Sequence, residues 1–313
     1  MELIWHVVGL VAVSGAAILV PWAGMRMLAP FLVECGRMAR NYRGREVPLG
    51  LGIVWVFWGV AVATHQLLAM VFRLPHEYTS SLWFEIVTAV PLVVGAFVFG
   101  LIDDAFGSAG HKGFRGHLSA LVHGRLTTGA IKLFGIGFLA LLGAARPAFG
   151  WDGLTVLTLL HYGAAVLVIG LAANTVNLLD LRPGRALKAY TLLVFVTVPI
   201  GLWSLAGAED ALPLVSTLLD GVLVLVIALG PVVAIWRYEL GESGMLGDAG
   251  ANAFGMLAGL LLISALPFAG TVVAAAILLG LNLASERVSF SAIIERTPWL
   301  AAVDRWGRAV EGE

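Results

Sequence analysis

Long apolar runs alternate with short polar segments along almost the whole chain. Each apolar run approaches the roughly 20 residues that an α-helix needs to cross the hydrocarbon core of a bilayer. The last two runs are short and share a tight turn, so eight or ten spans also fit the pattern. We predict an all-α, polytopic bundle of about nine spans: Leu3–Met25, Leu49–Phe72, Leu82–Ile102, Thr127–Ala145, Leu154–Ala173, Leu187–Ala206, Val215–Trp236, Ala251–Pro267 and Gly270–Ala284.

The composition excludes a soluble globular protein. Hydrophobic residues make up 59% of the 313 residues and charged residues only 12%, against about 25% charged in soluble domains. Met1–Met25 lacks a basic leader and a small-residue cleavage site, so we expect a retained first span. The single cysteine, Cys35, allows no intramolecular disulfide.

The basic residues orient the predicted bundle. With the N-terminus outside, 17 of the 19 lysines and arginines fall in cytoplasmic segments, and only Arg73 and Arg146 lie outside. Cytoplasmic loops of membrane proteins carry such an excess of Lys and Arg. We therefore expect a multi-pass protein of the plasma (inner) membrane, with its C-terminus in the cytoplasm.

The chain divides into a transmembrane region, 1–284, and a cytoplasmic tail, 285–313. Within the tail, Trp299, Leu300, Val303 and Trp306 have helical spacing and lie among arginines. The segment is too polar to span a membrane, and we expect an amphipathic helix in the interface.

Three acidic turns lie at predicted span ends on the cytoplasmic side. Asp103-Asp104 follow the third span, where a helix C-terminus would favour cations; the simpler reading is a solvated helix end. Asn174, Asn177 and Asp180 end the fifth span. The two asparagines share a helix face, and they would line a cavity or bond a neighbouring helix.

The third turn contains Asp248 between Gly247 and Gly250, just before the eighth span. Glycines permit a tight turn and close approach of a ligand. Asp248 is a candidate helix N-cap, and it is also a candidate metal ligand, since one carboxylate can do both. Carboxylate and amide oxygens suit Mg²⁺, with Mn²⁺ as an alternative. Phosphate oxygens and water would complete the coordination shell of the ion.

Basic residues near these turns would bind an anion. Lys132 stands out because it lies inside an apolar run, where it either meets a phosphate or snorkels to the interface. The positions of most other cytoplasmic cations are explained by the topology rule and by attraction to anionic lipid. The seven histidines are scattered and predict no zinc site.

Three motifs in this order resemble one family, the polyprenyl-phosphate N-acetylhexosamine-1-phosphate transferases. The family's paired aspartates match Asp103-Asp104, and its Asn-x-x-Asn-Leu-x-Asp motif matches the segment 174–180. Its Gly-Asp-x-Gly turn matches 247–250. The surroundings of Lys132 and Arg45 are also similar to family segments. The resemblance covers roughly residues 43–285.

The resemblance implies transfer of a sugar-1-phosphate from a UDP-sugar to a polyprenyl phosphate, with Mg²⁺ and release of UMP. A UDP-N-acetylhexosamine donor and a role in cell-envelope polysaccharide synthesis are expected. Nucleic acid is not an expected partner, and a homodimer is left open. The resemblance implies Asp103, Asp104 and Asp180 as catalytic, Asp248 as metal ligand, and Asn174, Asn177, Lys132 and Arg45 as substrate-binding. Arg287 in the tail is a further substrate-binding candidate, because arginine can bind phosphate through two hydrogen bonds.

The sequence departs from the family in three places. Gly107 stands where the family has a third acid, Leu181-Arg182-Pro183-Gly184 replaces a Gly-Leu-Asp-Gly segment, and the tail from Ser285 has no histidine cluster. A catalytically inactive relative, which binds lipid phosphate or scaffolds envelope assembly, is therefore the alternative. A transporter is a third alternative and predicts ionisable residues at the bilayer midplane.

Overall fold

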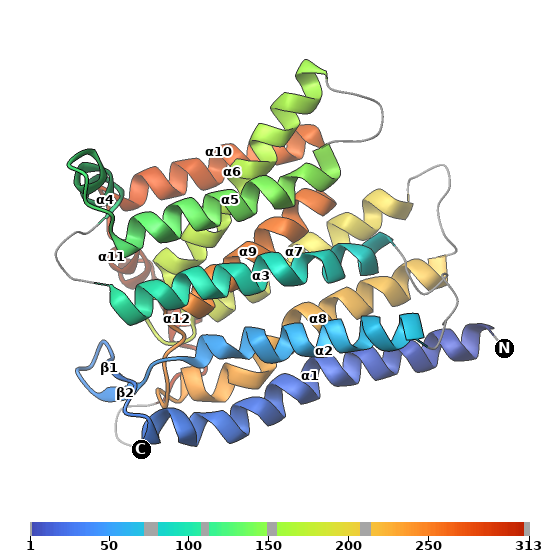
Figure 1. The fold of residues 1–313 in the computed structure, drawn as a ribbon, viewed down its shortest axis with the longest axis horizontal. Coiled ribbons are helices and arrows are strands. Elements are labelled where there is room, and N and C mark those ends of the chain that lie inside the picture. The colour runs from blue at the N-terminus through green and yellow to red at the C-terminus, as the bar shows by residue number, and fades with distance from the viewer. Residues whose placement is uncertain (1, 72–80, 108–112, 149–154, 207–213, 310–313) are drawn as a thin grey trace.

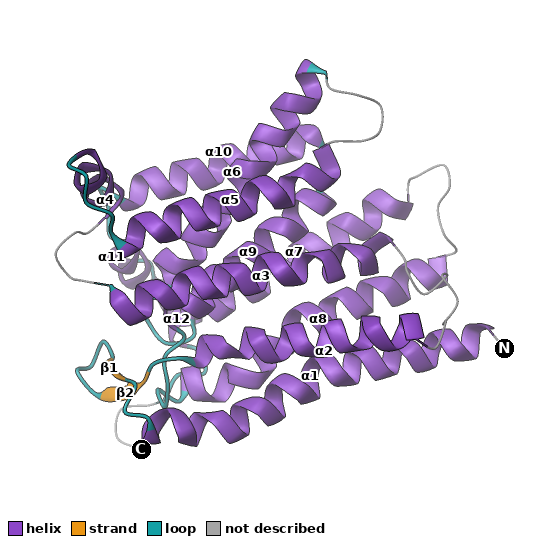
Figure 2. Cartoon of the chain, in the orientation of Figure 1, coloured by secondary structure: helices purple, strands orange, loops and turns teal. Residues whose placement is uncertain are grey.

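The protein is a bundle of long helices. The computed structural model describes residues 2–71, 81–107, 113–148, 155–206 and 214–309 (Figures 1 and 2). A 3₁₀ turn (Leu51–Ile53) precedes α2, and the two strands form an antiparallel hairpin. The elements are α1 (Glu2–Glu34), β1 (Met38–Arg40), β2 (Glu46–Pro48), α2 (Val54–Val71), α3 (Ser81–Phe106), α4 (Gly113–Val122), α5 (Thr128–Ala148), α6 (Val156–Leu179), α7 (Arg185–Ala206), α8 (Leu214–Leu240), α9 (Gly247–Ala265), α10 (Phe268–Ser285), α11 (Phe290–Arg296) and α12 (Pro298–Arg305).

The predicted all-α membrane bundle is confirmed. Among the described residues, eight helices are long and apolar enough to cross a membrane, namely α1, α3 and α5–α10. The apolar stretch Leu51–His65, which includes the 3₁₀ turn and the start of α2, is shorter, and α2 packs beside α1 and α3. The start of α1 and the position of α12 lie at opposite ends of the bundle (Figure 1). A chain that starts at one end of a bundle and finishes at the other crosses it an odd number of times. Eight crossings would not give this arrangement, whereas nine, with α2 included, would.

Several boundaries differ from the prediction. Helix α1 continues to Glu34, and Asp103-Asp104 lie within the last turn of α3 instead of in a turn after it. The hairpin after α1 was not predicted, because its strands are only three residues long. The expected outer loops 73–81, 146–153 and 207–214 lie largely outside the described residues.

Helix α9 is the centre of the bundle. It packs chiefly against α3 and α6, and also against α7, and it is the most buried of the candidate spans. Small residues let these backbones approach closely, as is common between membrane helices. A Cβ on Gly100 of α3 would lie 2.6 Å from the Ala249 nitrogen, and one on Gly259 would lie 2.7 Å from the Ile169 Cα. The glycines therefore set the spacing between α9 and its neighbours.

An aromatic cluster joins α2, α7 and α9 in the core. Trp55, Tyr190 and Phe254 are fully buried, and their rings meet edge to face, with Phe254 centroids 4.6 Å from Trp55 and 4.7 Å from Tyr190. The Tyr190 hydroxyl donates to the Ala228 carbonyl at 2.9 Å. Buried phenol groups need such a partner, so this bond also ties α7 to α8.

The tail docks on the bundle through a buried ion-pair cluster. The Asp304 carboxylate on α12 is buried and accepts hydrogen bonds from Arg185 at 2.9 and 3.0 Å and from Arg308 at 2.5 Å. Arg308 also donates to the Pro183 carbonyl at 2.9 Å. Burial by itself would raise the pKa of the Asp304 carboxyl, but its bonds and charge pairing with Arg185 hold the pKa below its usual value. The tail is thus fixed to the turn between α6 and α7.

The close packing at Gly100 leads to a first prediction. Replacing Gly100 with alanine should destabilise the bundle by about 1–3 kcal/mol, because the added methyl overpacks the contact with α9. The effect is measured by heating the protein in detergent and monitoring the loss of its monodisperse peak in size-exclusion chromatography. Gly137→Ala on α5 is the matched control, since a Cβ there meets nothing within 4 Å. Equal stability of the two variants would contradict this role for Gly100.

Asp304 gives a second prediction. Asp304→Asn should release the tail at neutral pH, because Arg185 and Arg308 then lie buried without a counter-charge, a change that costs about 3–5 kcal/mol. Trypsin cleavage at Arg296 and Arg305 should speed up at least tenfold. The exposed pair Arg182–Glu295, at 3.2 Å, supplies the control Glu295→Gln, which should change cleavage little.

The lowered pKa of Asp304 also fixes the pH dependence of docking. A carboxyl with a depressed pKa in the folded state stabilises it above the unfolded-state pKa and loses this contribution as the pH falls through the folded-state value. Wild-type protein should therefore keep its tail docked at neutral pH. Release of the wild-type tail on raising the pH from 5 to 7 would contradict the ion-pair account.

Candidate active site

Three helices bring Asp103, Lys132 and Asp248 together at one end of the bundle. The Lys132 Nζ on α5 lies 2.6 Å from Asp103 Oδ2 on α3, and it also contacts Asp248 Oδ2 on α9. The lysine side chain is 16% exposed. One ammonium group therefore bridges two carboxylates that are 145 residues apart in sequence. Lys132 is paired, and does not merely extend its charge toward the interface.

Asp104 has a different role from its neighbour Asp103. Its two oxygens accept the backbone N–H groups of Asp248, at 3.0 Å, and of Ala249, at 2.9 Å. The N–H groups at a helix N-terminus lack partners within the helix and favour negative charge. Asp104 thus supplies the cap of α9 from another helix. The reading of Asp248 as the N-cap is wrong, since Leu246 occupies that position and Asp248 lies in the first turn.

Gly247 makes this contact sterically feasible. It has φ +73°, a conformation that glycine adopts at little cost. A Cβ there would lie 2.7 Å from Asp104 Oδ2 and 2.8 Å from the side chain of Leu49. Position 247 therefore requires glycine on both grounds, which explains part of the Gly-Asp-Ala-Gly pattern.

Asp180 lies next to this group, directly after α6. Burial raises the pKa of its carboxyl well above the usual value, and the neighbouring carboxylate of Glu239 acts in the same direction. The backbone N–H of Gly247 hydrogen-bonds Asp180 and partly opposes this rise in pKa. Asp180 is therefore linked to the same turn that carries Asp248.

The two asparagines of α6 have different surroundings. Asn174 donates to Asn282 Oδ1 of α10 at 2.5 Å, and Asn282 in turn donates to Thr175 Oγ1 at 2.8 Å. Asn174 therefore takes part in interhelical hydrogen bonding, the simpler of the two readings. Asn177 Oδ1 is buried and has no hydrogen-bond partner among the described residues. Such an acceptor is costly to leave unpaired, which favours Asn177 as a ligand contact.

Arg45 and Arg287 lie apart from the Asp103–Lys132–Asp248 group. Arg45 is exposed in the hairpin, where its backbone N–H donates to Asn41 Oδ1 at 3.0 Å. Arg287 is exposed just after α10. No described contact joins either side chain to the site.

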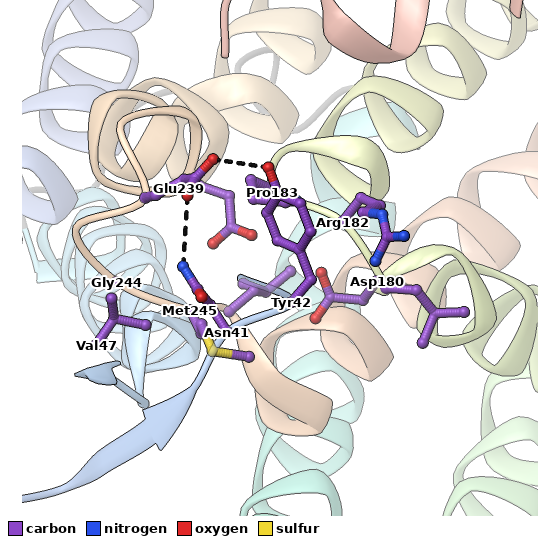
Figure 3. A pocket seen from close by; sticks show the side chains of 12 residues that line it. Asn41, Tyr42, Val47, Asp180, Arg182, Pro183, Glu239, Gly244 and Met245 are labelled. Carbon is purple, nitrogen blue, oxygen red and sulfur yellow. Dashed lines mark hydrogen bonds between the residues drawn. The ribbon is translucent and has the colours of Figure 1, made fainter. Parts of the chain in front are cut away.

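A pocket opens beside Asp180, with about 390 Å³ of empty space that includes its mouth (Figure 3). The hairpin, the α6–α7 turn and the α8–α9 turn contribute its walls. Its two glutamates, Glu239 and Glu242, were not predicted as site residues. They lie at the end of the long apolar helix α8, just as Asp103 and Asp104 lie at the end of α3, so the same sequence signal could have identified them. The polar and charged lining residues are Asn41, Tyr42, Asp180, Arg182, Glu239 and Glu242.

A magnesium ion at this site would need most of its ligands from phosphate oxygens and water. Within the described residues, no group of three or more His, Cys, Asp or Glu side chains is arranged to hold a metal ion. Mg²⁺ usually takes only one or two protein carboxylates and completes its shell with water and phosphate oxygens. Asp248, the predicted metal ligand, is paired with Lys132 in this structure.

Comparison of the chain with known protein-family models and with curated proteins finds no match.

Proposed function

We propose that the protein transfers a sugar-1-phosphate from a UDP-sugar to a polyprenyl phosphate at the cytoplasmic face of the plasma membrane and releases UMP. A UDP-N-acetylhexosamine is the proposed donor, and envelope polysaccharide synthesis the proposed context. The observation that supports this most directly is the bridge from Lys132 to Asp103 and Asp248 at one end of a membrane bundle. A lipid phosphate and a water-soluble nucleotide can both reach such a position.

The reaction needs charge neutralisation more than a special nucleophile. An oxygen of the lipid phosphate attacks the phosphorus that carries the sugar; the new P–O bond forms as the bond to UMP breaks, and its electron pair leaves with UMP. Phosphoryl transfer of this kind depends on in-line positioning and on cations near the phosphate oxygens. Lys132 is suited to pair with those oxygens once a ligand competes for it.

The acidic side chains divide the remaining tasks. Asp103 is suited to accept a proton from the lipid phosphate, and Asp104 holds the first turn of α9 in position. Asp248 would hold Mg²⁺, which when bound would neutralise charge on the diphosphate. Asn177 and Asp180 are proposed to contact the nucleotide and its phosphates, with Arg45 and Arg287 as more distant anion contacts.

One observation favours the alternative, an inactive relative that binds lipid phosphate or scaffolds envelope enzymes. Lys132 already pairs with both carboxylates, so a metal ion or a substrate would have to compete with it. Gly107 and Pro183, where the family has acids, agree with that alternative. The two proposals differ in whether UMP is released.

The function leads to a third prediction. Purified protein with undecaprenyl phosphate, Mg²⁺ and a panel of UDP-sugars should release UMP, and Asp248→Asn should reduce the rate about 100-fold or more, the usual scale for losing electrostatic stabilisation. Glu295→Gln, an exposed carboxylate on α11, is the control. Full activity of the Asn variant, or of wild type in excess EDTA, contradicts the metal role. Binding of the lipid phosphate without UMP release from any donor favours the scaffold.

The membrane side provides a fourth prediction. Cys35 is the only cysteine, is exposed, and follows α1 at the end of the bundle that carries the hairpin. A membrane-impermeant maleimide should therefore label inverted vesicles and leave intact cells unlabelled. Cys35→Ser provides the blank. Labelling of intact cells would place the site outside and would contradict access to a cytoplasmic UDP-sugar.

A further inference from the structure

The pocket beside Asp180 has its own chemistry, distinct from the Lys132 group. We call it the hairpin pocket, since Asn41, Tyr42 and Val47 of the hairpin region form one wall. Three of its lining residues are acids and one, Arg182, is basic. Figure 3 shows side chains from the hairpin, the α6–α7 turn and the α8–α9 turn gathered around it.

One of the three acids already has its partners inside the protein. Glu242 accepts the Tyr42 hydroxyl at 3.0 Å and the Asn41 amide at 3.4 Å, and it pairs with Arg43 at 3.0 Å. Its charge is therefore compensated. The pocket's basic residue is also engaged, since Arg182 pairs with Glu295 and lies over the Tyr42 ring, 4.7 Å from the centroid.

Glu239 is different, because half of its carboxylate has no partner. The residue is only 4% exposed, and its Oε1 accepts the Gly184 backbone N–H at 3.5 Å. Its Oε2 is buried without a hydrogen-bond partner among the described residues. A buried acceptor without a partner is unfavourable, and more so when it is charged. Asp180, which accepts the Gly247 N–H and forms no ion pair among the described residues, lines the same pocket.

We propose that the hairpin pocket binds a primary ammonium group, with Glu239 Oε2 and Asp180 as its acceptors. An ammonium carries one positive charge and three N–H donors with no acceptor, which complements two neighbouring acids that form no ion pair among the described residues. The inference goes beyond the proposed transferase function, since an amine can bind here without any phosphoryl transfer.

The test uses ethanolamine as the probe and the full chain in detergent. Ligand-detected NMR should show ethanolamine binding to wild type, whereas N-acetylethanolamine, which lacks the charge, should neither bind nor compete. Glu239→Gln should weaken binding about tenfold or more, the scale for losing a charged hydrogen bond. Glu46→Gln, an exposed glutamate of the same hairpin, should leave binding unchanged.

Two further variants separate the possible failures. Asp180→Asn should also weaken binding. Resistance of the tail to trypsin serves as the check of folding, and if Glu239→Gln fails that check, Asp180→Asn takes its place as the test. Asp248→Asn should keep ethanolamine binding even though UMP release is lost, so the two proposals fail independently. No binding to wild type, unchanged binding in the properly folded Glu239→Gln variant, or displacement of ethanolamine by Mg²⁺ at the pocket would each overturn the inference.

Discussion

The hydrogen bonds from the first turn of α9 to Asp104 are the contact on which the candidate site depends. A helix that begins at the end of a membrane bundle has backbone N–H groups without partners, and here a carboxylate from α3 accepts two of them. Glycines at positions 100 and 247 allow the two backbones to come close enough. The same contact brings Asp248 to the side of Asp103, so that Lys132 can bridge them.

Two ion clusters with opposite charge balance lie at this end of the protein. Around Lys132, one cation meets two carboxylates; around Asp304, one carboxylate meets Arg185 and Arg308. The second cluster is internally bonded and fixes the tail to the α6–α7 turn. That turn also carries Asp180 and Arg182, so the tail restrains residues that line the hairpin pocket. The tail is therefore part of the architecture of the site.

The position of the charged groups also bears on the class of protein. Asp103 and Asp104 lie in the last turn of α3, and Asp248 lies in the first turn of α9. These are helix ends, whereas a transporter site usually lies near the midplane between broken helices. Chemistry at a membrane face, where a lipid headgroup meets a soluble ligand, is more consistent with this arrangement.

The sequence by itself determined the membrane bundle, because span-length apolar runs and so few charges leave no other way to bury the chain. It also singled out Asp103, Lys132 and Asp248, since polar groups at the ends of apolar helices are conspicuous. Only the tertiary structure separated Asp103 from Asp104, gave Asn174 an interhelical partner, and joined Asp304 to Arg185. The reason is that periodicity reports which face of a helix is apolar, whereas these three contacts join residues more than 100 positions apart.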